Sequence, residues 1–428
     1  MPSANQVKVT IGGAESTAGT AVARTVAIPH RGMPTMKVQY EKAPDPAISG
    51  ENMMLGKYAV AGDVAGSIPI GFRASAGVGM CLNSILGQEV TPVQIGALIR
   101  IRHTGSEASA KIIANTAANT IDADIGDKGS EAADTNWGTA GSIDLTNSSY
   151  DTVSELVAAI DGYSEYECEK VFGPGATDAG LIQTMTRQAS DGWAYFWFTS
   201  ASSGAYLHQW PVVLTTTQRP TYSIQIDERQ DNFTYAGCVI NEFNINAALR
   251  GFIEADVNIL GFTETGGQSA SSVATATEEP MRFHNGKLSV GPYDFTYIRN
   301  HSINMSNQHR NEGYGQGSIF RQFHEKGTFK ATGSAQVRLN TNADLIKDFV
   351  NSTTLVKINF YYTGATIVTD ITEFAMFEMP YCSIDDFDWT ENEGVIDATF
   401  PFEVVKGTGT RYDDPMTVSL VTTDSAVY

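Results

Sequence analysis

Two stretches of this chain repeat each other, and they decide its architecture. The first reads GCVINEFNI at residues 237–245 and continues as RGFIEADV at residues 250–257. The second reads YCSIDDFDW at residues 381–389 and continues as EGVIDATF at residues 393–400. Cys238 and Cys382 stand at the same point of the two stretches. Because an internal repeat means that one structural unit was built twice, we expect two related modules.

The repeat extends upstream of these stretches. GSIPIGFR from Gly66 resembles GSAQVRLN from Gly333, and a short helical pattern follows each of them. Each copy then has an alternating segment that is typical of a strand, TYSIQIDE from Thr221 and LVKINFYY from Leu355. The predicted order in both copies is strand, short helix, strand, strand, strand.

The two copies are unequally spaced, which indicates an insertion. Gly66 and Gly333 are 267 residues apart, whereas Gly251 and Gly394 are 143 apart, a difference of 124 residues. The extra segment must lie between the short helix and the strand at Thr221, and its length suits a small domain. The predicted division is an N-terminal arm (1–35), module 1 (36–91 plus 216–264), an inserted domain (92–215), a linker (265–280), module 2 (281–405) and a C-terminal tail (406–428).

Composition favours a mainly β protein and excludes several functions. Segments rich in Val, Ile, Thr, Phe and Tyr are broken by many of the 40 glycines. The net charge is −20 and no basic run occurs, which argues against a surface that grips DNA or an anionic membrane. We find no signal peptide and no apolar run long enough to span a bilayer. The four cysteines show no close pairing, so we expect buried thiols in a chain made in a reducing cytoplasm.

The inserted segment reads as a small α+β domain. Thr152 and Glu155 have capping-box spacing before an apolar helical face, and Gly162 ends the helix. Strands are predicted from Ala97, over YECEKVF and over WAYFWF. Its aromatic side chains suit either a core or a surface that stacks on a sugar or base, and they are Trp193, Tyr195, Phe196, Phe198 and Trp210.

No catalytic motif is present in the sequence: we find no nucleophile elbow, P-loop, HExxH or CxxC. His301, His309 and His324 lack the spacing of a zinc site, and we expect them at the surface. The acidic residues at 385, 386 and 388 alternate as on a half-exposed strand, without the ligands and glycine turn of a calcium loop. We therefore predict no enzyme activity, no cofactor and no metal, and favour a scaffold.

The repeat resembles the tail tube proteins of bacteriophages with long, non-contractile tails. The resemblance is carried by FTYAGCVINEFNINAALRGFIEADVNILGF (233–262), its echo in the second copy, and AGDVAGSIPIGFRASAGVGMCLNSILG (61–87). It covers roughly residues 30–90, 210–265 and 280–405. The insertion departs from the family pattern, and we expect a decoration domain on the outer surface that ring assembly does not require.

The resemblance implies two tandem β-sandwich or barrel modules that close into rings, whose inner strands form one continuous β-barrel without free edges. A single-module member closes as a hexamer, so a chain with two modules should form a homotrimer with pseudo-sixfold symmetry. Rings would stack into a tube through the loops at 43–57 and 301–317 and through the termini. The implied inter-ring contact residues are Asp45, Glu51, Asn307, Arg310 and Glu312.

The resemblance also implies a conduit through which genomic DNA passes without specific binding. Acidic side chains in the lumen would repel phosphate. The candidates are Asp227, Glu228, Glu254, Asp256, Asp385 and Asp397. The implied partners are further copies of the chain, a tape-measure protein, a tail terminator and baseplate or tip proteins, with no membrane. The implied location is the virion tail, after synthesis in the host bacterial cytoplasm.

Three alternatives stay open at this point. A virion or surface adhesin could recognise a glycan through the aromatic residues of the insertion. A polysaccharide-degrading enzyme would need paired carboxylates in a cleft. The tube of a contractile injection machine is disfavoured because its subunits usually have one module.

Overall fold

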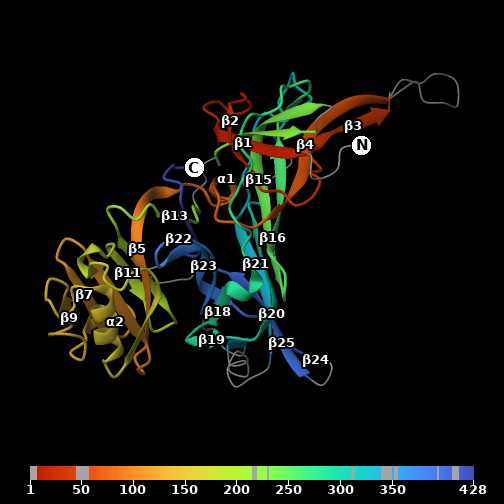
Figure 1. Ribbon diagram of the computed structural model, residues 1–428. Coiled ribbons are helices and arrows are strands. Elements are labelled where there is room, and N and C mark those ends of the chain that lie inside the picture. Colours follow the sequence, from red (N-terminus) through yellow and green to blue (C-terminus); the bar gives the residue numbers. More distant parts are fainter. Residues whose placement is uncertain are drawn as a thin grey trace, which may run out of the picture.

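The computed structural model describes residues 7–44, 57–214, 219–228, 231–309, 313–338, 349–350, 355–392, 395–406 and 414–428. Strands dominate the described part, which confirms the predicted mainly β class. Figure 1 places the long strands on one side of the molecule and the inserted segment on the other, with the β3–β4 hairpin projecting from the body.

One antiparallel sheet of eight strands, here called the long sheet, passes through both copies of the repeat. Its strands, in order across the sheet, are β3 (Lys37–Pro44), β4 (Lys57–Gly71), β16 (Ile253–Gly261), β15 (Asn232–Ala248), β20 (Ile298–Ser306), β21 (Lys330–Arg338), β25 (Val395–Val404) and β24 (Asp388–Asn392). The two copies meet where β15 pairs with β20, from Glu242 opposite Ser306 to Ala248 opposite Asn300. We call this β15–β20 pairing the internal seam.

The repeat in the sequence is a repeat in strand register. Ile245 pairs with Ala255 in the first copy, and Trp389 pairs with Ala398 at the matching place in the second. The same holds for three further pairings: Gly71–Glu254 matches Arg338–Asp397, Val38–Val64 matches Met305–Ala331, and Tyr222–Cys238 matches Val356–Cys382. One backbone arrangement is therefore built twice, as predicted from the matched sequences.

A second sheet covers the long sheet in each copy, and here the predicted termini need correction. In the first copy it holds β2 (Arg24–Ala27), β1 (Lys8–Ala14), β14 (Tyr222–Asp227), the start of β15 and β17 (Thr263–Thr265). Residues 1–35 are therefore not a separate arm over their described part. Ile11 of β1 pairs with Ile224, as Val290 of β18 (Gly286–Val290) pairs with Ile358 in the second copy.

The second copy has the matching sheet. It holds β19 (Tyr293–Phe295), β18, β22 (Val356–Val368), β23 (Ile371–Ser383) and β26 (Thr417–Thr422). The prediction of a polar tail after residue 405 is wrong over β26, because every residue of this strand is buried. Tyr428 also lies buried, and its ring stacks on His208.

The inserted segment begins and ends in two strands that extend the sheet of the second copy. β13 (Tyr206–Pro211) pairs with both β26 and β5 (Val90–His103). β5 also pairs with β10 (Tyr166–Phe172) and β12 (Ala194–Thr199). A smaller sheet holds β6 (Ser109–Asn115), β7 (Thr120–Gly126), β8 (Ala132–Ala133), β9 (Ser142–Asp144) and β11 (Met185–Gln188).

The helix of the insertion forms as predicted. α2 (Val153–Asp161) begins at Thr152, whose side chain and that of Glu155 make a reciprocal capping box. Val153, Leu156 and Ile160 bury the predicted apolar face in a core that belongs to the insertion alone. The described residues also form two short 3₁₀ turns, at Ala179–Leu181 and Phe283–Asn285.

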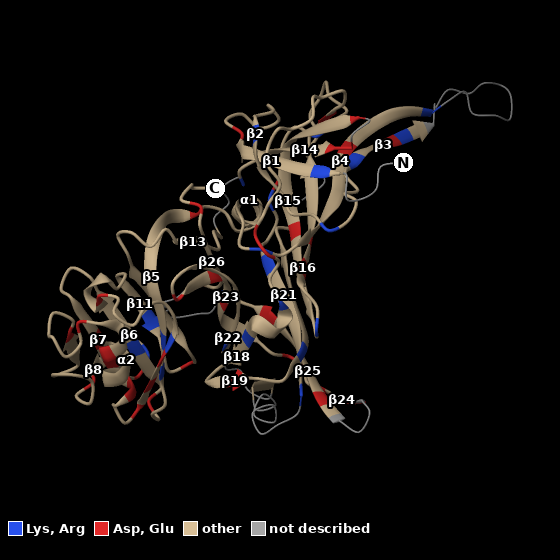
Figure 2. Ribbon diagram, viewed as in Figure 1, with Lys and Arg blue, Asp and Glu red and all other residues tan. Residues whose placement is uncertain are grey.

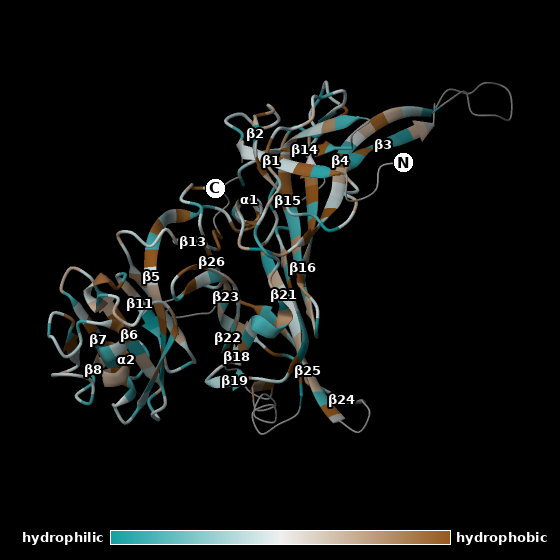
Figure 3. Cartoon of the chain, viewed as in Figure 1, coloured by the Kyte–Doolittle hydropathy of each residue, from teal (hydrophilic) through white to brown (hydrophobic). Residues whose placement is uncertain are grey.

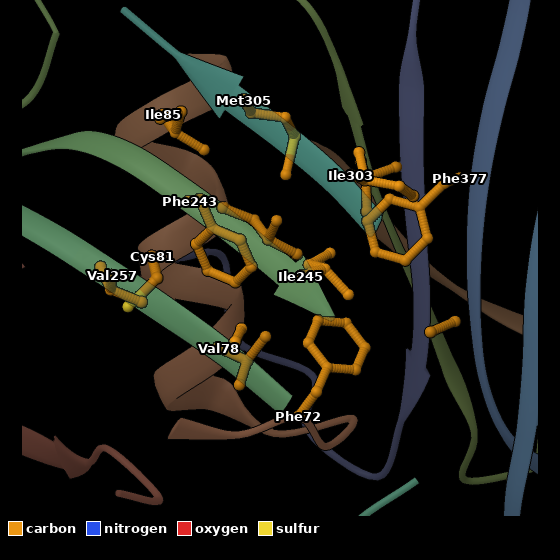
Figure 4. Close-up of a cluster of buried hydrophobic side chains, with 14 of the residues drawn as sticks. Phe72, Val78, Cys81, Ile85, Phe243, Ile245, Val257, Ile303, Met305 and Phe377 are labelled. Atoms are coloured by element: carbon orange, nitrogen blue, oxygen red, sulfur yellow. The ribbon is translucent and has the colours of Figure 1, made fainter. Parts of the chain in front are cut away.

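The main core lies between the long sheet and its covering sheets and is continuous across the internal seam. α1 (Ala76–Leu86) buries Val78, Cys81 and Ile85 against β15. Figure 4 shows Phe243 and Ile245 of β15 meeting Ile303 and Met305 of β20 under this helix. The matching helix predicted in the second copy falls mostly outside the described residues. All four cysteines are free and buried, as predicted.

Candidate assembly surfaces

The long sheet turns one face to the core, and its opposite face, here called the open face, is polar. Successive side chains of a strand point to opposite faces, and Figure 3 shows the resulting alternation of hydrophilic and hydrophobic residues. The side chains of the open face include Glu242, Asn244, Asn246, Glu254, Asp256, Asn258, Asn300, Ser302, Asn304, Ser306, Thr332, Ser334, Gln336, Thr399 and Glu403. The same register also places Lys330, Arg338, Asp388 and Asp397 on this face, so amides and hydroxyls are interspersed with charges of both signs.

Cross-strand hydrogen bonds hold these side chains in place. Asn300 Nδ2 donates to Gln336 Oε1 at 2.7 Å, and the hydroxyls of Ser302 and Ser334 lie 3.0 Å apart. Asn258 Nδ2 donates to Glu242 Oε2 at 2.7 Å. Such pairs between facing strands are the unit that stabilises a sheet. The face is thus an ordered polar surface.

The structure brings three of the predicted acidic residues to the open face. Glu254 and Asp256 lie there together, but Arg31 approaches both, at 3.3 and 3.5 Å. Asp397 is on the same face of β25, almost fully buried beside Arg299 at 3.4 Å. The open face therefore carries its acids largely as ion pairs. Figure 2 shows that most of each long strand is neither acidic nor basic.

The other three predicted acidic residues lie elsewhere. Asp227 ends β14 in the covering sheet, where it is buried and accepts from Ser271 N at 2.8 Å. Glu228 follows it, and Asp385 is exposed in the turn after β23. Sequence reasoning missed Glu242, although its alternation with Asn244 and Asn246 on one strand was a usable signal.

Both outer strands of the long sheet have an edge that no other strand of the described residues pairs with, here called the free edge. At the start of β3 side chains of the same subunit bond to this edge, since Val38 N donates to Glu264 Oε2 and Tyr235 Oη donates to Met36 O. Among the described residues, β3 pairs only with β4, and β24 pairs only with β25. Edge strands expose main-chain donors and acceptors that can pair with another chain. Trp389 of β24 and Ile396 of β25 are 43% and 45% exposed, which leaves an apolar patch beside one free edge.

The β3–β4 hairpin projects from the body and exposes apolar side chains. Tyr40, Tyr58 and Val60 are all about half exposed or more, at 50%, 63% and 49%. At the base of the hairpin Tyr40 meets Phe320, with 6.0 Å between the ring centres, and Gly62 N donates to Ile319 O. The predicted contact residues Asp45 and Glu51 lie outside the described residues.

The second predicted contact loop differs from expectation. Residues 301–306 belong to β20, and Asn307 is fully buried, where its amide donates to Ile85 O at 3.0 Å. Arg310 and Glu312 lie outside the described residues. Because Asn307 is enclosed within its own subunit, its side chain is not on the surface of this structure.

The end of the long sheet opposite the β3–β4 hairpin has a hollow. The strand direction places the turn between β15 and β16 at the end of the long sheet away from the β3–β4 hairpin. A hollow of about 560 Å³ opens there, and its lining includes Leu249 and Tyr297, which are 46% and 62% exposed. One end of the sheet thus carries a projection with exposed apolar side chains. The other end carries a hollow whose lining combines apolar residues with Arg250, Arg299 and Arg338.

The histidines predicted at the surface are buried, and this prediction is wrong. His301 packs between aromatic rings, with its ring centre 4.5 Å from that of Phe360. His324 Nε2 donates to Gly237 O at 2.6 Å. Burial lowers the pKa of His301 to about 3, of His324 to about 3 and of His309 to about 4, so all three are neutral in the folded protein.

The aromatic residues of the insertion do not form a binding surface. Trp193, Tyr195, Phe196, Phe198 and Trp210 are all at most 1% exposed. These side chains therefore cannot stack on a glycan, and they give no support to the hypothesis of a glycan-binding adhesin.

One group of metal-binding side chain types occurs in the described part of the chain. His103, Glu107 and Glu165 bring one ligand atom each within 4.8 Å of one another. His103 Nε2 lies 3.4 Å from Glu107 Oε2. No helix in the described residues is long and apolar enough to cross a membrane.

These surfaces define a structural protein: two copies of one β module, free sheet edges, and an ordered polar face. The comparison with protein families agrees, because the model of the phage tail tube protein family matches residues 4–404. No curated protein matches the chain. Since the match covers nearly the whole sequence, the chain belongs to the phage tail tube protein family. It is a structural component of the virion tail and not an enzyme.

Proposed function

We propose that three copies of this protein close into a ring and that the rings stack into the DNA-conducting tail tube of a long-tailed phage. The observation that carries the proposal is the internal seam, where two modules join edge to edge and leave the edges of β3 and β24 free. A chain that joins modules in this way can continue the same pairing with its neighbours until the ring closes.

The ring size follows from the repeat. Six modules around an axis would need six single-module subunits but only three copies of this chain, which gives a homotrimer with pseudo-sixfold symmetry. Closure would place eight strands from each subunit in one barrel and remove every free edge of the long sheet. We place the tube in a non-contractile tail, because the duplicated chain resembles the tube proteins of such tails.

The open face supports a lumen through which DNA slides. Asn300 bonds to Gln336 and Ser302 to Ser334 across its strands. Four of its acids, Glu254, Asp256, Asp397 and Glu403, lie beside Arg31, Arg299 or Lys330. Such a face offers few unpaired cations to phosphate, so passing DNA gains little from stopping. We therefore propose a lumen that is polar and charge-paired, in place of an acidic lumen that repels phosphate.

Stacking would use the two ends of the long sheet. We propose that the exposed Tyr58 and Val60 of one ring enter the hollow beside Leu249 and Tyr297 of the next. The loop at 43–57, with Asp45 and Glu51, stays part of this proposed contact, as do Arg310 and Glu312.

The domain division is also part of the proposal. The strand pairings support module 1 over 7–89 and 212–264, the insertion over 90–211, a linker at 265–280 and module 2 from 281 onward. The insertion would sit outside the tube. Assembly would begin in the host bacterial cytoplasm, with a tape-measure protein, a tail terminator and baseplate or tip proteins as partners.

Negative-stain electron microscopy of the purified protein, dilute and concentrated, tests this function. The expected result is hollow rings with three outer projections and, on concentration, tubes. Rings with six projections would refute the trimer, and a protein that stays monomeric when a preformed tube end is supplied would refute the tube function.

A further inference from the structure

We infer that β24 of one subunit pairs with β3 of the next in the register of the internal seam, and that two carboxylates occupy the main-chain donors at this joint until the subunits meet. The partner is a second copy of this chain. The inference rests on the proposed ring, and it specifies which atoms join.

The register follows from the repeat. β20 corresponds to β3, because Met305 pairs with Ala331 as Val38 pairs with Val64. The end of β15 corresponds to β24, since the pair Asn244–Asp256 matches the pair Asp388–Thr399.

At the internal seam Phe243 faces Met305 and Asn244 faces Asn304. Carried to the free edges, this register puts Phe387 opposite the partner subunit's Val38. It puts Asp388 opposite the partner subunit's Lys37. The segment before β3 already follows β4 in the same register, because Thr35 N donates to Ser67 O at 2.9 Å.

The main-chain donors at the two free edges point the right way for this pairing. Val38 N does not bond to β4 but donates to Glu264 Oε2 at 3.2 Å. Phe387 N donates to Asp386 Oδ1 at 2.8 Å. Two residues that both direct their N–H groups to the edge can form a hydrogen-bonded pair in an antiparallel ladder. In the separate subunit each of these donors is held by a carboxylate.

The first copy of the repeat provides the comparison. Glu242 stands at the position of Asp386, but its carboxylate accepts from Asn258 at 2.7 Å. The next residue, Phe243, is already paired with Met305 across the seam. The carboxylate at this position therefore bonds the following main-chain N–H where the strand has no neighbour. Charged groups at sheet edges are a known way to prevent unwanted pairing.

The side chains of the two edges are complementary as well. Where the internal seam has the neutral pair Asn244–Asn304, the free edges carry the opposite charges of Asp388 and Lys37, and both are exposed. Opposite charges directly across an antiparallel pair are favourable. Trp389 is 43% exposed, whereas its counterpart Ile245 at the seam is fully buried, so a neighbouring subunit would cover it.

Cysteine cross-linking tests the register. In the inferred joint residues 37 and 388 form a non-hydrogen-bonded pair, with Cα atoms about 4.5 Å apart, within the range of a disulfide. The variant with Lys37→Cys and Asp388→Cys should form covalent dimers and trimers, and no larger species, when rings are oxidised. The variant with Lys37→Cys and Thr390→Cys is two residues out of register, about 7–8 Å apart, and should stay uncross-linked.

The internal seam supplies a positive control. Asn244→Cys with Asn304→Cys places cysteines at the equivalent pair and should close within one chain, whether or not rings form. The four native cysteines are buried, which keeps the background low. Rings seen by microscopy without a 37–388 cross-link would overturn the register and leave the tube function standing. A protein that assembles neither alone nor on a preformed tube end would overturn both.

A matched pair of variants tests the role of the Asp386 carboxylate. Asp386→Ala frees the Phe387 donor, so tube growth followed by light scattering should become roughly two- to tenfold faster, the factor expected for one hydrogen bond. Glu242→Ala removes the equivalent carboxylate at the internal seam and should leave the growth rate unchanged. Growth of Asp386→Ala at or below the parent rate would overturn the role of Asp386.

Discussion

Gly66 and Gly333 occupy the same place in the repeat, and both lie where two main chains approach closely. A Cβ on Gly66 would come within 2.4 Å of Met36 Cα. A Cβ on Gly333 would come within 2.4 Å of Ser302 O and 2.3 Å of Phe402. Glycine stands at both matching positions because the same close approach to a neighbouring strand is built twice.

We therefore expect Gly333→Ala to destabilise the protein by about 1–3 kcal/mol, the usual cost of overpacking. Gly13→Ala is the control, because a Cβ there meets no atom within 4 Å. That variant should be unchanged or more stable by up to about 1 kcal/mol. The free energy of unfolding in urea measures both, and equal effects of the two substitutions would contradict the steric argument.

The buried histidines should make the fold sensitive to acid. The folded pKa of His301 is about 3, while an unfolded histidine titrates near 6.5. Between these values the unfolded chain binds more protons, so stability is full above about pH 6.5 and is lost as the pH falls. Each such histidine contributes about 1.4 kcal/mol per pH unit to this loss.

His301→Phe tests this pH dependence, since a phenyl ring suits the aromatic surroundings and cannot be protonated. The slope of unfolding free energy between pH 6 and pH 4 should fall by about 1.4 kcal/mol per pH unit. Burial raises the pKa of Glu373 to about 7, so this carboxyl changes the stability with pH in the opposite direction. Its effect is the same in parent and variant and cancels in the comparison. The exposed His284 is the control, and His284→Asn should keep the parent slope.

At the element scale, the insertion is bound firmly to the second copy of the repeat, although it interrupts the first. Its Phe172, Trp193 and Trp197 share a buried core with Tyr361 and Phe374. The strands β13 and β5 continue the sheet of β26 and β23. The insertion therefore ties the two modules together, and removing it would expose an apolar face. This argues against the expectation that it is dispensable.

Phe374→Ala tests whether this shared core holds the insertion to the second copy. The ring is fully buried, with centres 5.3 Å from Phe172 and 5.9 Å from Trp197, so its loss should cost about 3–5 kcal/mol. Phe323, which is 42% exposed, gives the control, and Phe323→Ala should cost well under about 1 kcal/mol. Hydrogen exchange should also rise in β12 and β13 of the first variant. Unchanged exchange there would mean that the insertion is held without this core.

How much of the fold was predictable depends on whether the pattern was local. The repeat fixes strand register because Cys238 and Cys382 mark equivalent points, and the capping box of α2 lies within four residues. A strand was predicted over residues 7–11, but its pairing with β14 escaped prediction, as did β26, because the partners are distant in sequence, as Ile11 is from Ile224. The candidate surface was predictable to the same extent. Glu254 and Asp256 were named as acidic residues on a predicted strand, whereas their ion pairs with Arg31 could not be foreseen, because Arg31 is distant in sequence.

At the scale of the whole molecule, stacking depends on the two ends of the long sheet. Tyr58→Ser with Val60→Ser removes the apolar surface of the projecting hairpin, which the hollow beside Leu249 would cover in the next ring. We expect rings to persist and tubes to shorten or vanish, because the exchanged side chains are exposed and outside the core. Val427→Ser is the control. Val427 is 62% exposed, but it lies next to the C-terminus, away from the β3–β4 hairpin, and does not line the hollow. Micrographs of concentrated samples decide the matter: full-length tubes from the double variant would exclude the hairpin from stacking.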